Sequence, residues 1–256
     1  MFCIFPNNMF NRDICYIWMN KFINVNGRIY LIPVTLGGDD FLQVIPEKVI
    51  SLTRHLRYFI VEDIRSARRF LRLIDKEFPI NDSVFYELNE HMGESDIAHY
   101  LGPVLKGWDM GVLSEAGLPG IADPGARIIA LAHQKRFTVI PLSGPSSIIL
   151  ALISSGLNGQ NFSFNGYLPI KPAERNSKLR ELEKKAGEGF AQIFMETPYR
   201  NQKMFESLVS ICHNETLLCI AADITLPTES IRTMKISEWK KDLPLLNDKL
   251  VVFVMQ

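Results

Sequence analysis

The sequence predicts an α/β protein in which helices alternate with strands of mostly parallel sheets. Two observations support this fold class. After residue 27, short runs rich in β-branched and aromatic residues alternate with longer amphipathic segments, which is typical of strand–helix–strand units. Glycine- and proline-rich loops follow several of the predicted strands, and open α/β sheets bind ligands at that edge.

The first half of the chain is predicted to form five strands, at residues 28–33, 58–62, 84–87, 109–114 and 138–141. Helices are expected at 47–55 and 64–74, because apolar residues recur there at helical spacing. A further helix is expected to open at Asp123-Pro124, since an acidic cap followed by proline favours a helix start.

The second half is predicted to contain helices at 146–154, 171–186 and 201–211, and extended segments at 162–167, 189–195, 215–222, 230–235 and 249–254. A boundary near residues 142–145 divides the chain into an N-terminal α/β domain, 26–142, and a C-terminal α/β domain, 143–256. The ligand cleft is expected where the two domains meet. Residues 1–25, rich in aromatic residues and asparagine, are expected to be an N-terminal extension, either an accessory arm or the product of a start codon assigned upstream of Met19.

The composition excludes several classes of function. Lys and Arg together number 28, as do Asp and Glu, so no global field attracts DNA or a membrane and any nucleic-acid contact must be local. The four cysteines show no C-x-x-C spacing and the five histidines no metal-ligand spacing; no metal is predicted, and a reducing cytoplasm is the expected compartment. No apolar run reaches the length of a bilayer span.

The most informative segment is GVLSEAGLPGIADPG, at residues 111–125. An apolar strand leads into a loop with several glycines and two prolines, and then into a helix. Glycine lets a ligand approach the main chain, while Pro119 and Pro124 stiffen the loop. The loop therefore predicts a preformed pocket, although a tight connection without a ligand has the same local composition.

Two other turns follow predicted strands. Residues 141–147 end in Ser146 and Ser147, which suit a carboxylate or polar ligand tail at a helix start, or else form a simple cap through Ser143. The turn at 33–40 has neither the G-x-G-x-x-G pattern of dinucleotide sites nor the lysine of a phosphate-binding loop, which argues against a nucleoside triphosphate. No serine lies in a G-x-S-x-G elbow, which argues against that class of hydrolase.

Charged residues cluster after two predicted strands, at 62–69 and 195–200. Acidic helix caps and solvated basic faces explain such clusters without a function. The functional alternative is substrate binding by Arg65, Arg69 and Arg200, because a guanidinium group matches phosphate.

Taken in order, these segments resemble the tetrapyrrole methylase superfamily of S-adenosylmethionine-dependent enzymes. Within it they most resemble the small-subunit ribosomal RNA 2′-O-ribose (cytidine) methyltransferase branch. The resemblance runs from about residue 28 to the C-terminus and rests mainly on the specific glycine loop, with individually weak matches at 33–37, Glu62-Asp63 with Arg65, 144–146, 164–169, 196–200 and 226–229.

The resemblance implies two α/β/α domains of the tetrapyrrole methylase type with the cofactor cleft between them. It further implies S-adenosyl-L-methionine as methyl donor, a homodimer, and small ribosomal subunit RNA as partner. By position, the implied cofactor-binding residues are Leu36, Gly37, Glu115, Ala116, Gly117, Pro119, Ile121, Ala122, Ser146, Ser147 and Met195.

The resemblance implies no single catalytic side chain. Glu62, Asp63 and Glu196 are candidates for a general base only because they follow predicted strands at the cleft. The sequence departs from the ribosomal RNA branch at Glu115 and Leu118, where Asp and Thr are usual, and at Gly38, where Asn is usual. These departures bear on the methyl acceptor.

Two alternatives stay open. A porphyrinoid C-methyltransferase would use Arg65, Arg69 and Arg200, with Lys171 and Lys178, to hold the carboxylates of a macrocycle. A non-catalytic S-adenosylmethionine-binding paralogue would bind the cofactor without transferring its methyl group.

Overall fold

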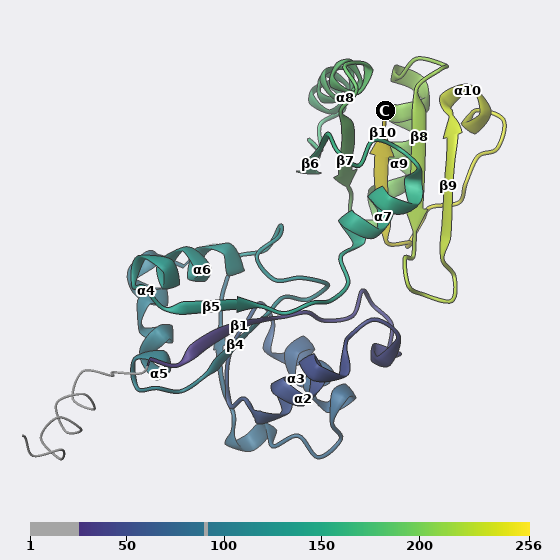
Figure 1. Ribbon diagram of the computed structural model, residues 1–256. Coiled ribbons are helices and arrows are strands. Elements are labelled where there is room, and N and C mark those ends of the chain that lie inside the picture. Colours follow the sequence, from purple (N-terminus) through teal and green to yellow (C-terminus); the bar gives the residue numbers. More distant parts are fainter. Residues whose placement is uncertain (1–25, 90–91) are drawn as a thin grey trace, which may run out of the picture.

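The computed structural model describes residues 26–89 and 92–256, which form two five-stranded sheets with helices on their faces (Figure 1). The predicted N-terminal extension, residues 1–25, lies outside the described residues. The α/β fold class predicted from the sequence is confirmed.

The first sheet is entirely parallel, with the strand order β3-β2-β4-β1-β5. Its strands are β1 (Arg28–Ile32), β2 (Tyr58–Val61), β3 (Val84–Glu87), β4 (Met110–Leu113) and β5 (Thr138–Pro141). Because all five run in the same direction, their carboxyl ends and the loops that follow them lie at one edge of the sheet.

Helices cover both faces of this sheet. They are α2 (Glu47–His55), α3 (Ile64–Ile74), α4 (Glu94–Ala98), α5 (Gly102–Leu105) and α6 (Gly125–Gln134), with short 3₁₀ turns at Phe41–Gln43, Ile80–Asp82 and His99–Leu101. Consecutive residues of β2 point into different cores: Phe59 packs with α2 and α3, whereas Ile60 packs with α4, α5 and α6. This alternation follows from the two-residue period of a strand buried on both faces.

The second sheet is mixed, with the order β6-β7-β10-β8-β9. Its strands are β6 (Phe162–Tyr167), β7 (Ala191–Met195), β8 (Leu217–Ala222), β9 (Ser230–Lys235) and β10 (Val251–Met255). Only β6 and β7 pair in parallel. The mostly parallel arrangement expected for the whole chain therefore does not extend to this sheet, because the short connection from β8 to β9 forces an antiparallel hairpin.

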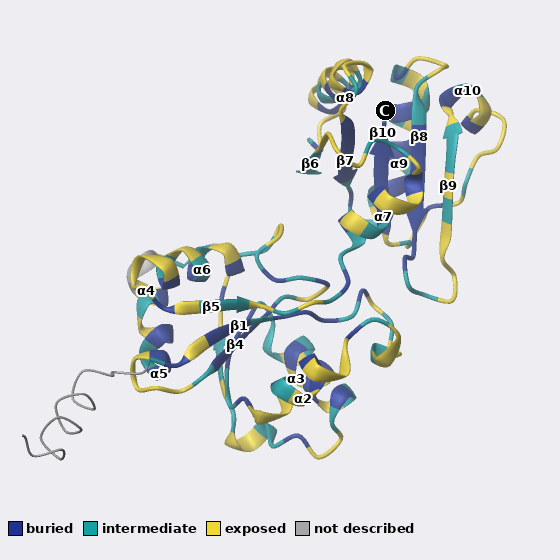
Figure 2. Ribbon diagram, viewed as in Figure 1, coloured by how far each residue is buried: buried dark blue, intermediate teal, exposed yellow. Residues whose placement is uncertain are grey.

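The second sheet is also covered on both faces. The helices are α7 (Ser147–Ser155), α8 (Pro172–Gly187), α9 (Asn201–Ile211) and α10 (Ile236–Trp239), with a 3₁₀ turn at Pro198–Arg200. Phe253 packs on the α8, α9 and α10 side, and its neighbour Val252 packs on the α7 side. Figure 2 shows the resulting burial: β7, β8 and β10 are dark blue, whereas the edge strand β9 is largely intermediate.

Two helix starts differ from the predictions. The helix expected at Asp123-Pro124 begins at Gly125, and Asp123 accepts a hydrogen bond from the Gly125 N–H at 2.6 Å. The cap of α7 is Ser146, which accepts from the Ile149 N–H, rather than Ser143. The structure thus places the start of α6 one residue later than expected and the cap of α7 three residues later.

Within residues 26–89 and 92–256, none of the helices combines the length and hydropathy that a bilayer span requires. The same residues contain no cluster of three or more side chains suited to a metal ion.

Candidate ligand site between the two sheets

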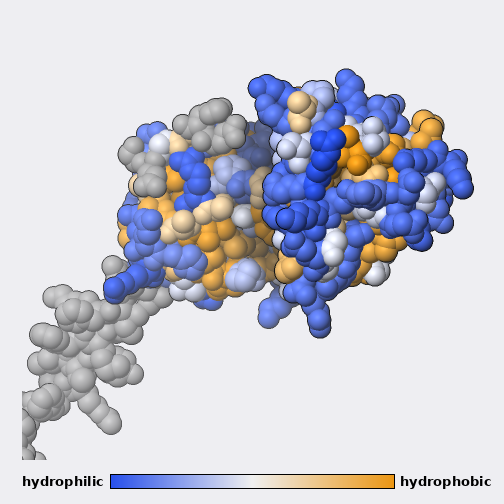
Figure 3. All heavy atoms as spheres, turned by 90° about the horizontal axis from the view of Figure 1, so that it is seen from above, coloured by the Kyte–Doolittle hydropathy of each residue, from blue (hydrophilic) through white to orange (hydrophobic). Residues whose placement is uncertain are grey.

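A cavity of about 310 Å³ lies where the carboxyl edge of the first sheet faces the second sheet. Loops after β1, β2, β4 and β5 form one wall, and the ends of β6, β7, β8 and β10 contribute the other. In the space-filling view a groove separates the two halves, and apolar side chains reach it from the first half (Figure 3).

The glycine loop after β4 is held in shape by Asp123. Its carboxylate accepts hydrogen bonds from the Gly120 N–H at 2.8 Å and from the Gly125 N–H at 2.6 Å. Gly117 and Gly120 have φ values of 70° and 89°, in the left-handed region that favours glycine. Ala122 adopts φ 59° without being glycine, and such local strain is often found at functional sites.

Three loops meet at Gly117. The Val34 N–H donates to the Gly117 carbonyl at 2.9 Å, which joins the turn after β1 to the glycine loop. A Cβ added at Gly117 would lie 3.2 Å from Leu36 Cδ2 and 3.3 Å from the Pro145 carbonyl oxygen. The close approach therefore depends on glycine at this position, and it places the three loops around one wall of the cavity.

Glu62 is a partly buried carboxyl group in the cavity wall. Its Oε2 accepts a long hydrogen bond, 3.4 Å, from the Glu115 N–H. Burial raises the pKa of the Glu62 carboxyl, and the hydrogen bond from Glu115 opposes the rise only in part. Burial likewise raises the pKa of Asp123 against the effect of its backbone hydrogen bonds. The site thus holds two carboxyl groups that are costly to ionise.

Glu196 forms the other acidic group of the wall and is 5% exposed. Its Oε1 accepts from Arg200 Nη2 at 2.6 Å, from Arg200 Nε at 3.0 Å and from the Thr197 N–H at 2.8 Å. Among the described residues nothing donates to its second oxygen. The ion pair with Arg200 fixes the Glu196 side chain at the end of β7.

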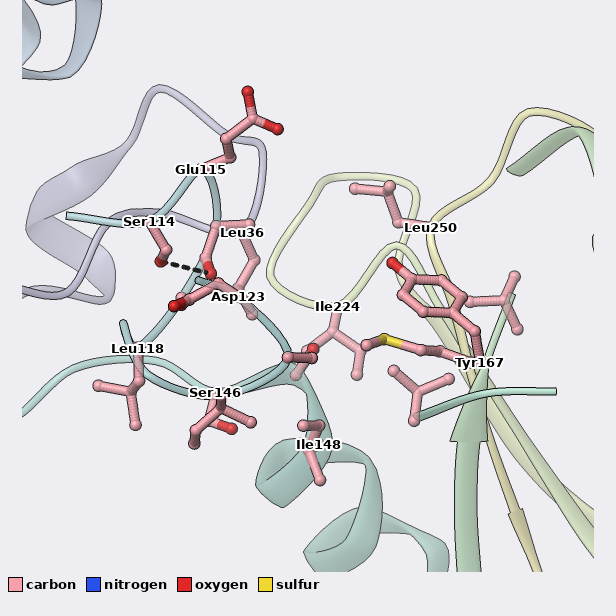
Figure 4. A pocket seen from close by; sticks show the side chains of 18 of the residues that line it. Leu36, Ser114, Glu115, Leu118, Asp123, Ser146, Ile148, Tyr167, Ile224 and Leu250 are labelled. Atoms are coloured by element: carbon pink, nitrogen blue, oxygen red, sulfur yellow. Dashed lines mark hydrogen bonds between the residues drawn. The ribbon is translucent and has the colours of Figure 1, made fainter. Parts of the chain in front are cut away.

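The remaining wall is largely apolar. Figure 4 shows Leu36, Leu118 and Asp123 on one side of the cavity and Tyr167 and Leu250 on the other. Ser146 and Ile148 lie between the two sides at the start of α7, and the Ser114 hydroxyl donates to the Ala116 carbonyl. An apolar pocket with a few convergent polar groups is typical of a small-molecule site.

Most of the residues predicted to bind a cofactor lie around this cavity: Leu36, Glu115, Ala116, Gly117, Ile121, Ala122, Ser146, Ser147 and Met195. Gly37 and Pro119 belong to the same loops but are not part of the wall. Sequence reasoning missed the contributions of Tyr167, Ile224 and Leu250. For Tyr167 the available signal was the match at 164–169, and for Ile224 it was the neighbouring match at 226–229. Leu250 had no such signal.

The other predicted residues divide between the cavity and the surface. Glu62 and Glu196 line the cavity, whereas Asp63 caps α3 by accepting from the Ser66 N–H at 2.7 Å, which lowers its pKa. Arg65 and Arg69 are exposed on α3 and do not line the cavity, and Arg200 is engaged by Glu196. Their assignment to substrate binding stays a prediction.

No protein-family model matches the chain. Curated relatives do: "Ribosomal RNA small subunit methyltransferase I" of Vibrio cholerae is 29% identical over 82% of this chain and 69% of its own length. The protein of the same name from Escherichia coli O157:H7 is 27% identical over 86% of this chain and 74% of its own. The solved structure of the methyltransferase CobJ superposes with a TM-score of 0.59 at 18% identity, over 89% of this chain and 93% of that one.

The chain is thus similar in sequence to ribosomal RNA methyltransferases and similar in fold to the methyltransferase CobJ. These curated relatives are methyltransferases, and the chain is assigned to the same class of enzyme. The likeness to CobJ shows the shared fold alone.

Proposed function

We propose that this protein transfers the methyl group of S-adenosyl-L-methionine to the 2′-hydroxyl of a cytidine ribose in small-subunit ribosomal RNA. The observation that supports it most is the cavity between the two sheets, around which the glycine loop, the turn after β1 and the start of α7 converge. The relatives named for small-subunit ribosomal RNA methylation support the choice of acceptor.

The cavity suits S-adenosylmethionine in size and chemistry. Its volume, about 310 Å³, lies at the lower end of the range of small-ligand pockets. At Gly117 the absent side chain leaves a cradle that a Cβ would occupy, bounded by Leu36 and Pro145. Leu36, Gly117, Ser146 and Met195 would hold the cofactor, with apolar contacts from both halves of the chain.

Bound S-adenosylmethionine would supply an electrophilic methyl group on a positively charged sulfur. The protein must then orient the acceptor and exclude water. Glu62 is our candidate for the group that accepts the ribose hydroxyl proton, because its carboxylate lies in the cavity wall and its raised pKa makes it a better base. Glu196, fixed by Arg200, is assigned a positioning role.

The homodimer and the cytoplasmic location are part of the same proposal. Ile149 and Ile153 lie one turn apart on α7 and are 43% and 69% exposed, which is the apolar surface that a second copy would cover. A cytoplasmic location would give the enzyme access to ribosomal subunits.

The test is transfer of a tritium-labelled methyl group to small ribosomal subunits that lack the native cytidine ribose methylation, with naked ribosomal RNA alongside. Label recovered as 2′-O-methylcytidine after digestion is the expected result. Saturable S-adenosylmethionine binding without label in RNA would instead indicate another acceptor, such as a porphyrinoid, or a paralogue without turnover.

A further inference from the structure

The exposed face of α3 is lined by four arginines and contains no carboxylate. Arg65, Arg68, Arg69 and Arg72 are exposed, and their spacing of three and four residues places them on one side of the helix. The opposite side, with Phe70 and Leu71 among its residues, is buried in the first core. We call these four side chains the α3 arginine face.

The α3 arginine face has no ion pair within the described part of the chain. Other arginines are neutralised by carboxylates: Arg54 by Asp75, Arg200 by Glu196, and Arg232 by Asp242. On α3, Arg68 lies over the Phe85 ring at 5.2 Å from its centroid, and Arg72 donates to the Lys76 carbonyl. No hydrogen bond is described for the Arg65 and Arg69 side chains. Arg65 lies close enough to Asp63 to help lower the pKa of that carboxyl, whose Oδ1 accepts from the Ser66 N–H.

The face begins beside the cavity. Glu62, at the end of β2, lines the cavity wall, Asp63 caps α3, and Arg65 follows two residues later. From Arg65 to Arg72 the helix rises by roughly 10 Å at 1.5 Å per residue. A chain of phosphates held along this face would therefore run directly to the cavity.

We propose that the α3 arginine face binds the phosphate backbone of the RNA whose ribose enters the cavity; the inference rests on the proposed function. Guanidinium groups match phosphate oxygens in geometry as well as charge. A protein partner is disfavoured because the α3 arginine face offers no exposed aromatic or large apolar side chain of the kind that anchors protein interfaces. An anionic membrane is disfavoured because the apolar side of α3 is already buried in the core.

The test compares two matched double variants. Arg65→Gln/Arg69→Gln removes two charges at i,i+4 spacing from the α3 arginine face. The control, Arg180→Gln/Lys184→Gln, removes two exposed charges at the same spacing from α8, and neither side chain has a described partner. Figure 1 shows α3 and α8 at opposite ends of the molecule.

The affinity for a fluorescent RNA fragment of the small subunit is measured from about 50 to about 200 mM salt, because phosphate contacts weaken over this range. For the α3 variant we expect the affinity for RNA to fall by about tenfold or more. The slope of log affinity against log salt should become shallower by about 1.4, because each of the two lost phosphate contacts contributes about 0.7. The KM for RNA in methyl transfer should rise with kcat unchanged, and the control should match wild type.

Equal affinity and equal salt slopes in the two variants would overturn the inference, and wild-type methyl transfer to RNA would leave the proposed function standing. Wild-type protein that binds RNA through α3 but transfers no methyl to it would support the inference and refute the proposed function. Binding to phosphatidylserine vesicles that depends on α3, with RNA affinity unaffected, would assign the face to a membrane and overturn the inference.

Discussion

Glu62 and Asp123 are two carboxyl groups of the cavity wall that differ in how well hydrogen bonds compensate their burial. Both carboxyl groups lie in the cavity wall, and burial raises the pKa of each. Asp123 is compensated by two short backbone hydrogen bonds, whereas Glu62 has one at 3.4 Å. An ionised Glu62 therefore costs the folded state free energy, as is common for groups kept for function rather than for stability.

Replacement of Glu62 by Gln should raise the melting temperature at pH 7. Burial raises the pKa of Glu62 in the folded protein above its value in the unfolded chain. The protonated carboxyl therefore favours the folded state at low pH, and this contribution is lost as the pH rises through the raised pKa. The advantage of Glu62→Gln should thus shrink below about pH 4, where both side chains are neutral.

Thermal unfolding from pH 3.5 to 8 measures this difference, with Glu206→Gln on the exposed side of α9 as control. If Glu62 is the base, Glu62→Gln should also lower the rate of methyl transfer by about a hundredfold or more. A variant that is less stable than wild type at pH 7 would contradict this account of Glu62.

Asp123→Ala should loosen the glycine loop. The change leaves the Gly120 and Gly125 N–H groups without their acceptor, and we expect the free energy of unfolding to fall by about 2–4 kcal/mol. Urea denaturation measures the loss, and calorimetric titration with S-adenosylmethionine measures the accompanying loss of affinity. Asp123→Asn, which keeps one acceptor oxygen, should be intermediate, and an unchanged affinity in Asp123→Ala would show that the loop does not shape the site.

At the scale of elements, the sequence predicts the strands and the long helices and misses the short helices. The helix α3 is predicted with its observed bounds because its apolar residues recur at helical spacing behind the Asp63 cap. Helices α4, α5 and α10 are only four or five residues long, too short to show a helical period. The glycine loop was predictable because its residues are contiguous.

The second wall of the cavity was not predictable in the same way. Leu250 reaches it because the residue precedes β10, which pairs between β7 and β8, far from both in sequence. Such a long-range antiparallel pairing leaves no local pattern of spacing.

Gly144→Ala tests the contact between the loops after β1 and β5. A Cβ at residue 144 would lie 2.1 Å from Pro33 Cβ and 2.4 Å from its Cγ, and the rigid ring cannot move aside. We expect the free energy of unfolding to fall by about 1–3 kcal/mol, with weaker S-adenosylmethionine binding because the two loops separate.

Chemical denaturation and calorimetric titration measure both effects. Gly159→Ala is the matched control, because a Cβ there would meet no atom within 4 Å. If the two alanine variants were equally stable, the two loops would not be in the contact described.

At the scale of the whole molecule, the two halves meet at the cavity. Leu36 comes from the turn after β1, yet it packs in the core of the second half with Ile148 and Ile224. We propose that residues 26–142 and 143–256 fold as separate domains, each covering both faces of its own sheet, with this contact between them. The net charge of zero then leaves RNA binding to local features such as α3.

In the function proposed above, the cavity between the two halves is the site of methyl transfer to RNA. Its most direct test is tritium transfer to unmethylated small ribosomal subunits by wild-type protein, by Ser147→Phe, which fills the cavity, and by Ser177→Phe, on the exposed side of α8. Wild type and Ser177→Phe should place label on a cytidine 2′-oxygen, while Ser147→Phe should lose about a hundredfold or more of that rate. Full transfer by Ser147→Phe, or none by wild type, would contradict the claim.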